Sequence, residues 1–125
     1  ISSLQQDNQA KQSRVEDLTN QAEEELNTAL EYRPDDDAAY NVLGAIYQNR
    51  AQAAWDQRNR TADNEKAKEF DEQGREHLKQ AMKYYEQATE IAPDNTQYWR
   101  SLFQIYTALG MDEKAKEAMK KAGMQ

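Results

Sequence analysis

The sequence predicts an all-α protein built of antiparallel helix hairpins, and three observations lead to this prediction. The chain has 125 residues but only 4 Gly and 2 Pro, so few residues interrupt long helices. Alanines and aromatic residues recur at helical intervals of three and four. The same intervals then return further along the chain, which is typical of an internal repeat. We therefore expect five stacked helices, the middle hairpin being longer than the others.

The first helix is expected from about residue 2 to residue 32. Its apolar stripe is confined to the second half and consists of Val15, Leu18, Ala22, Leu26 and Ala29. Residues 5–14 are nearly all polar. Three explanations remain open for this polar half: the tip of an arm, the end of a helix that has been cut, or a face that pairs with a second copy of the chain.

The second and third helices are expected to form the long hairpin. After Pro34, the acidic residues 35–37 suit the positive end of a helix dipole. The stripe of the second helix consists of Tyr40, Leu43, Tyr47, Ala51 and Trp55. The stripe of the third consists of Ala67, Phe70, Gly74, Leu78, Ala81, Tyr85, Ala88 and Ala92. A polar turn at 59–64 is expected to connect them, with Asp63 or Asn64 as the N-cap of the returning helix.

The fourth and fifth helices are shorter in this prediction. Pro93 ends the third helix, and Asp94 or Asn95 can cap the fourth. Gly110 can close the fourth helix, and Asp112 is expected to cap the fifth.

An internal repeat connects these helices. Intervals of 4, 3 and 5 residues join the members of two sets, Ala22, Leu26, Ala29, Pro34 and Ala81, Tyr85, Ala88, Pro93. The first two intervals occur again in Ala115, Met119 and Ala122. A second pattern of equal spacing is formed by Tyr40, Leu43, Gly44, Tyr47 and by Trp99, Leu102, Phe103, Tyr106. Small residues at these places allow close approach of neighbouring helices, and the aromatic rings fill the remaining space.

These residues resemble the tetratricopeptide repeat, whose signature is an aromatic residue, Leu-Gly and Tyr, followed by Ala, an aromatic residue, Ala and Pro over about 34 residues. The resemblance covers residues 15–125 and implies a short right-handed solenoid forming a single domain, 1–125. Residues 1–34 are then the second helix of a truncated repeat with a polar extension, 35–93 a full repeat with an insertion, and 94–125 the final repeat. The pattern is similar to bacterial proteins of this family that carry a long insertion in one repeat.

The insertion lies between Tyr47 and Ala81, which are 34 residues apart, whereas the equivalent step from Tyr106 to Ala115 is 9 residues. Shared between two helices, the roughly 25 extra residues would make an arm about 18 Å longer than an ordinary repeat. Trp55 is the arm's candidate site residue. It is expected either to pack on Phe70 inside the arm or to remain partly exposed as an anchor for a partner.

The resemblance also implies a concave groove lined by the first helices of successive repeats. Its candidate residues in this sequence are Asn41, Ala45, Gln48, Asn49, Gln97, Arg100, Gln104 and Thr107, with Ala38 and Ala108 at its margins. The set is polar and nearly uncharged. Only Asn41 and Arg100 suit the clamp by which some family members hold an acidic carboxy-terminal peptide. Asn and Gln can both donate to and accept from a peptide backbone, which suits sequence-tolerant recognition. The alternative, which stays open, is that these residues are an ordinary solvent-exposed surface.

Composition and motifs disfavour several classes of function. A formal charge of -7 disfavours nucleic acid, and no apolar run approaches the roughly 18 residues that direct membrane insertion requires. The chain has no Cys and a single histidine, His77, so a metal would need carboxylates such as Glu69, Glu72 and Glu76, which share a face more typical of solvated charge. No phosphate loop or nucleophile motif is present. We therefore expect no catalytic residue, no metal and no cofactor.

Two functional hypotheses follow. The first is a non-catalytic adaptor that binds a peptide or partner protein in the groove. The alternative is an architectural element in which the long arm and the uncovered first helix join copies of the chain into an oligomer, such as a homodimer, and no peptide is bound. The absence of Cys fits the periplasm or cell envelope and the cytoplasm alike, and the family resemblance favours the envelope. Because residue 1 is Ile, we expect a fragment or a processed chain.

Overall fold

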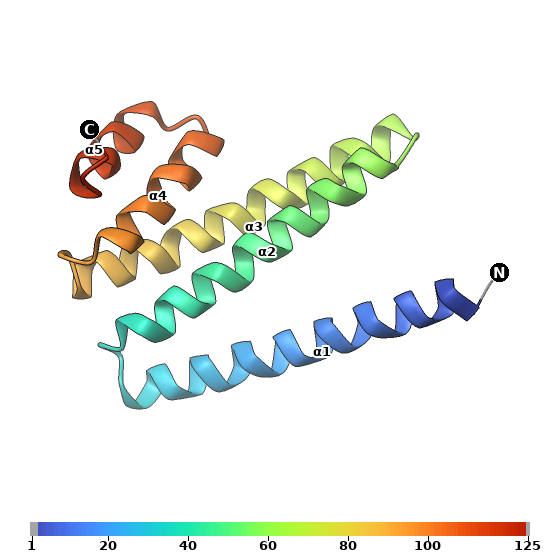
Figure 1. The fold of residues 1–125 in the computed structure, drawn as a ribbon, viewed down its shortest axis with the longest axis horizontal. Coiled ribbons are helices and arrows are strands. Elements are labelled where there is room, and N and C mark those ends of the chain that lie inside the picture. The colour runs from blue at the N-terminus through green and yellow to red at the C-terminus, as the bar shows by residue number, and fades with distance from the viewer. Residues whose placement is uncertain (1–2, 125) are drawn as a thin grey trace. The chain divides into compact units, whose positions relative to one another are not determined.

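The computed structural model describes residues 3–124, and these residues form five α-helices and no strand (Figure 1). In chain order they are α1 (Ser3–Tyr32), α2 (Asp37–Arg60), α3 (Asn64–Ile91), α4 (Thr96–Ala108) and α5 (Asp112–Lys121). The chain divides into two compact units, Ile1–Pro34 and Asp35–Gln125, and each unit is described by itself. The predicted all-α class with five helices is confirmed.

The helix of the first unit, α1, is a single run of 30 residues. The residue expected to begin it, residue 2, lies outside the described residues, and the predicted end at Tyr32 is confirmed. Pro34 follows two residues later and cannot donate to a helical hydrogen bond. No residue of α1 is buried, so this unit has no core of its own.

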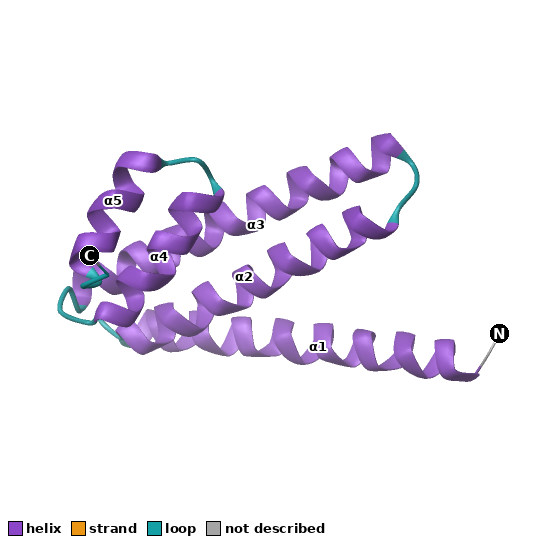
Figure 2. Cartoon of the chain, turned by 45° about the horizontal axis from the view of Figure 1, so that its top comes forward, coloured by secondary structure: helices purple, strands orange, loops and turns teal. Residues whose placement is uncertain are grey.

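The second unit begins with the long antiparallel hairpin of α2 and α3, which contain 24 and 28 residues (Figure 2). The Asp36 side chain caps α2 by accepting a hydrogen bond from the Ala39 N–H at 3.2 Å. At the tip of the hairpin, Asp63 accepts from the N–H groups of Glu65 and Lys66 at 2.9 and 3.3 Å. Both caps satisfy donors that the first turn of a helix leaves unpaired. The predicted extended hairpin and the Asp63 cap are confirmed.

Two glycines allow aromatic rings to lie directly against the backbone of this hairpin. A Cβ atom added to Gly44 of α2 would lie only 2.6 Å from Cε2 of Tyr85. A Cβ atom added to Gly74 of α3 would lie 2.5 Å from Nε1 of Trp55. Both distances are below ordinary van der Waals contact, so any larger residue would displace the ring. Gly44 therefore has the space-saving role expected from the repeat pattern.

The shorter helices α4 and α5 have 13 and 10 residues. Asn95 caps α4 by accepting from the Gln97 N–H at 3.0 Å, as the sequence predicts. Gly110 has φ +75, and the Met111 N–H reaches back to the Tyr106 carbonyl at 2.8 Å, which closes α4 with a glycine C-cap. The predicted cap of α5 was wrong. Met111 is its N-cap, without a side-chain hydrogen bond, and Asp112 is already the first helical residue.

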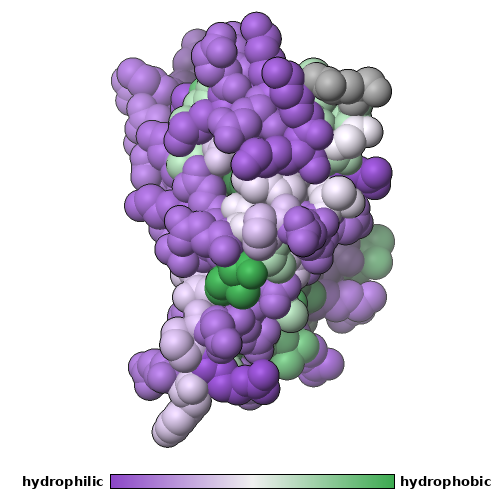
Figure 3. Space-filling model, turned by 90° about the vertical axis from the view of Figure 1, so that its left-hand side faces the viewer, coloured by the Kyte–Doolittle hydropathy of each residue, from purple (hydrophilic) through white to green (hydrophobic). Residues whose placement is uncertain are grey.

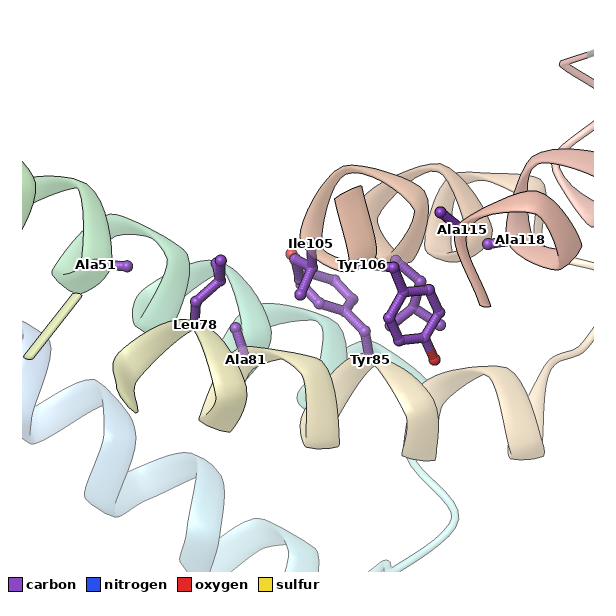
Figure 4. Packing of buried hydrophobic residues seen from close by; sticks show 9 residues of the cluster. Ala51, Leu78, Ala81, Tyr85, Ile105, Tyr106, Ala115 and Ala118 are labelled. Atoms are coloured by element: carbon purple, nitrogen blue, oxygen red, sulfur yellow. The ribbon is translucent and has the colours of Figure 1, made fainter. Parts of the chain in front are cut away.

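The core lies where α3 meets α2 on one side and α4 on the other, and α5 closes it (Figure 4). Its buried members are Ala51, Leu78, Ala81, Tyr85, Leu102, Ile105, Tyr106, Ala115 and Ala118. Alanines supply close helix approach and a few larger side chains fill the space, as the repeat pattern predicts. Burial of the predicted stripe of α3 from Gly74 to Ala88 is confirmed.

Candidate protein-binding surface

The candidate residues of the predicted groove lie on α2 and α4, and none of them is buried. On α2, Asn49 is exposed, whereas Asn41, Ala45 and Gln48 are partly exposed. The exposed members on α4 are Gln97, Arg100, Gln104 and Thr107, and the marginal residues Ala38 and Ala108 are exposed as well. We call these ten residues the amide surface. They are accessible in part or in full, which is what contact with another molecule requires.

Tyr85 connects the two helices that carry the amide surface. Its ring is buried against Gly44, and its hydroxyl donates to Oε1 of Gln48 on α2 at 2.8 Å. Burial raises the pKa of Tyr85, and a side-chain hydrogen bond with Ser101 of α4 acts in the opposite direction. One phenol on α3 therefore contacts both flanking helices. Because the oxygen of Gln48 accepts from Tyr85, its NH₂ group is the part that can donate to a ligand.

Tyr98 makes a second connection between the same helices. Its hydroxyl donates to Oδ2 of Asp37 at 2.7 Å, joining the start of α4 to the start of α2. Burial, the hydrogen bond to Asp37 and the charges of Asp37 and Asp36 raise the pKa of Tyr98 to about 12. Hydrogen bonds from a neutral donor to a carboxylate are stronger than neutral pairs. The relative positions of α2 and α4 are thus fixed at their first turns as well as near Tyr85.

A cluster of aromatic side chains, which we call the tyrosine edge, lies on α2 and α3 and was not singled out from the sequence. The ring of Tyr47 lies 5.6 Å from that of Tyr84 and 6.0 Å from that of His77, measured between centroids. Tyr40 lies 6.4 Å from Tyr84, and Arg50 stacks over Tyr47 at 4.8 Å. The spacing in the sequence could have indicated this cluster, because residues 77 and 84 are seven positions apart and share a helix face.

The single histidine, His77, lies beside an acidic depression on α3. Burial, and secondarily the Arg50 guanidinium, lower the pKa of His77. Glu69, Glu72 and Glu76 line an open depression beside it on α3. Within residues 3–124, however, no three His, Cys, Asp or Glu side chains come close enough together to hold a metal ion.

The arm candidate Trp55 is partly exposed and packs against the core. The sequence pointed to Phe70 as its neighbour, and the structure places Gly74 directly at the indole. The Nε1 atom of Trp55 is buried there without a hydrogen-bond partner. Further out, Arg58 and Asp71 form an ion pair of 2.7 Å between the two helices of the arm. The arm is therefore held by packing and by one charge-assisted hydrogen bond.

One face of the molecule can be compared by hydropathy. Figure 3 shows one face that is mainly hydrophilic, with small, separate hydrophobic patches. No helix formed by residues 3–124 has the length and apolar character to cross a bilayer.

Comparison with known families finds a repeat model that matches one segment of the chain. Residues 75–95, the second half of α3 and the turn after it, match the model of the tetratricopeptide repeat. This match confirms the resemblance drawn from the alanine and aromatic spacing. Repeats of this family typically bind proteins and are generally non-catalytic. No curated protein matches the chain.

Proposed function

We propose that the chain is a non-catalytic adaptor that binds an extended segment of a partner protein on the amide surface. The observation that carries the proposal is a pair of tyrosine hydroxyl bonds to α2: Tyr98 of α4 donates to Asp37, and Tyr85 of α3 donates to Gln48. A polar surface that is fixed before binding loses less conformational entropy when a ligand is ordered on it.

The chemistry of the surface indicates the kind of ligand. Asn41, Gln48, Gln97 and Gln104 offer amide groups that can pair with the N–H and C=O groups of a peptide backbone. Arg100 is the only charged candidate among the ten residues. The ligand is therefore expected to be recognised by its backbone and shape more than by its charge.

The test begins with selection of a displayed library of random peptides on the immobilised chain, followed by calorimetric titration of the enriched peptides. Asn41→Ala, Gln48→Ala and Gln104→Ala should each weaken peptide affinity about 2- to 10-fold, corresponding to a net ~0.5–1.5 kcal/mol for one hydrogen bond. The matched control is Gln87→Ala, which removes an exposed amide from α3 outside the amide surface. Circular dichroism verifies that each variant folds.

Two results would count against the adaptor. One is that no peptide is enriched over an unrelated helical protein. The other is that Gln87→Ala weakens binding as much as the three variants of the amide surface, since the peptide would then bind elsewhere.

The architectural alternative also has a specific observation in its favour. α1 presents large apolar side chains on the surface, with Val15 62% and Leu18 58% exposed. A module that only binds peptide has no need of such a stripe, whereas a self-associating element does. Self-association through α1 can be separated from peptide binding, because α1 and the amide surface lie on different units of the chain.

A further inference from the structure

The apolar stripe of α1 has no cover within its own unit. That unit consists of the one helix, none of whose residues is buried, and Leu4, Val15 and Leu18 are each more than half exposed. Helices owe most of their stability in proteins to packing of an apolar face, and a helix without such packing is marginal in water. The stripe therefore indicates a partner.

The charges of α1 indicate which partner. Residues 3–14 carry two basic side chains, Lys11 and Arg14, and one acidic side chain, Asp7. Residues 15–32 carry no basic side chain and six acidic ones, Glu16, Asp17, Glu23, Glu24, Glu25 and Glu31. A second copy of α1 in the antiparallel direction brings the basic half of each helix beside the acidic half of the other. A parallel copy brings the two acidic halves together, which is unfavourable.

The spacing of the stripe supplies the register. Leu4, Lys11, Val15, Leu18, Ala22, Glu25 and Ala29 follow one another at steps of seven, four and three, so they lie along one face of the helix. If two antiparallel copies cross at Leu18, then residue 11 of one helix is level with residue 25 of the other. Both residues lie seven positions from the crossing point, about 10 Å along the axis. The Lys11–Glu25 match occurs twice, once on each side of the crossing.

We propose that two copies of this chain associate through antiparallel pairing of α1, crossing near Leu18, with Lys11 of each copy beside Glu25 of the other. Leu18 and Val15 cover each other at the centre, and the charge matches set the direction. The inference goes beyond peptide binding and does not depend on it.

The first experiment measures self-association of the whole chain by sedimentation equilibrium. The wild-type chain should show a reversible monomer–dimer equilibrium that weakens at high salt, because the Lys11–Glu25 matches are screened. Leu18→Asp should raise the dimer dissociation constant at least tenfold. Asn27→Asp is the matched control: it adds the same charge on the opposite, exposed face of α1 and should leave the constant within about twofold.

The second experiment tests the direction of pairing by disulfide crosslinking. Because the chain has no Cys, no native thiol competes with the introduced ones. A disulfide needs Cα atoms within about 7 Å, whereas residues 11 and 25 of one helix are roughly 21 Å apart. Under mild oxidation, the K11C and E25C chains should remain uncrosslinked when alone. Mixed together, they should form one disulfide-linked heterodimer.

Several outcomes would overturn the proposal. The wild-type chain could remain a monomer at all concentrations, or the Leu18→Asp chain could dimerise as tightly as the wild type. Efficient crosslinking of K11C with itself would show parallel pairing. Peptide binding is measured separately on the Leu18→Asp chain. If this chain no longer dimerises but still binds peptide, the result supports both proposals. If the wild-type chain binds peptide but does not dimerise, only the dimer proposal is overturned.

Discussion

Replacement of Gly44 by alanine sets a gain in helix propensity against a loss in packing. Alanine is better than glycine inside a helix by about 0.5–1 kcal/mol, so an open site would be stabilised. At Gly44, however, the new Cβ would lie 2.6 Å from Cε2 of Tyr85 and 2.8 Å from Cδ2 and Cζ. Tyr85 is only 3% exposed and its hydroxyl is held by Gln48, so the ring has little room to move.

Overpacking of this kind costs about 1–3 kcal/mol. Once the propensity gain is subtracted, Gly44→Ala should lower the free energy of unfolding by roughly 0.5–2 kcal/mol. For a unit of this size that corresponds to a fall in Tm of about 2–16 °C. Urea and thermal unfolding followed by circular dichroism at 222 nm measure both quantities.

Two further variants test whether the contact with Tyr85 causes the loss of stability in Gly44→Ala. Tyr85→Met removes the ring, and in that background Gly44→Ala should become neutral or stabilising, which a double-mutant cycle reports as a coupling energy. Gly74→Ala also forces an indole aside, but Trp55 is partly exposed and its Nε1 has no partner to lose. Gly74→Ala should therefore lower the free energy of unfolding by less than Gly44→Ala does. The reasoning is refuted if Gly44→Ala stabilises the wild-type chain, or if its cost persists after Tyr85 is removed.

The remaining predictions concern a helix cap and a tyrosine. Asp36→Ala should lower the free energy of unfolding by about 0.5–2 kcal/mol, because the Ala39 N–H loses its acceptor. The control Asp112→Ala removes no side-chain cap and should change that free energy by less than about 0.5 kcal/mol in the same urea titration. Because the pKa of Tyr98 is raised from 10.0 to about 12, its contribution to stability is complete below pH 10 and is lost as the pH rises toward 12. The stability difference between wild type and Tyr98→Phe should therefore shrink over that interval, and a difference that stays constant would rule out the bond to Asp37 as its source.

Much of the fold could be predicted because helical periodicity and turn residues are local signals. The positions of the tip of the α2–α3 hairpin, the Asp63 cap and the Gly110 C-cap all follow from residues close together in the sequence. The cap of α5 could not be chosen in this way, because Asp112 is as suitable in the first helical turn, where the dipole favours it, as at the N-cap.

The less predictable features depend on residues distant in the sequence. The hydrogen bond of Tyr85 with Gln48 joins residues 37 apart, and that of Tyr98 with Asp37 joins residues 61 apart. Periodicity places a tyrosine on a face but does not identify the group its hydroxyl will reach. The exposure of the amide surface was predictable from the repeat register, whereas the hydrogen bond that attaches Gln48 to the buried Tyr85 was not.

The two segments of equal spacing in the sequence carry their large side chains at opposite positions, and this has a consequence for the proposed binding. Gly44 and Tyr85 occupy the repeat positions that Phe103 and Met119 occupy in the final repeat, so the bulky ring comes from the second helix in one case and from the first helix in the other. Only Tyr85 brings a hydroxyl that can hold a residue of the amide surface, and it holds Gln48. Thr107 corresponds to Gln48 in the sequence pattern, and Met119 corresponds to Tyr85. The thioether of Met119 cannot donate a hydrogen bond to Thr107 as the Tyr85 hydroxyl donates to Gln48. Among the variants of the proposed peptide site, Gln48→Ala should therefore have the largest effect, because its amide is oriented before the ligand arrives.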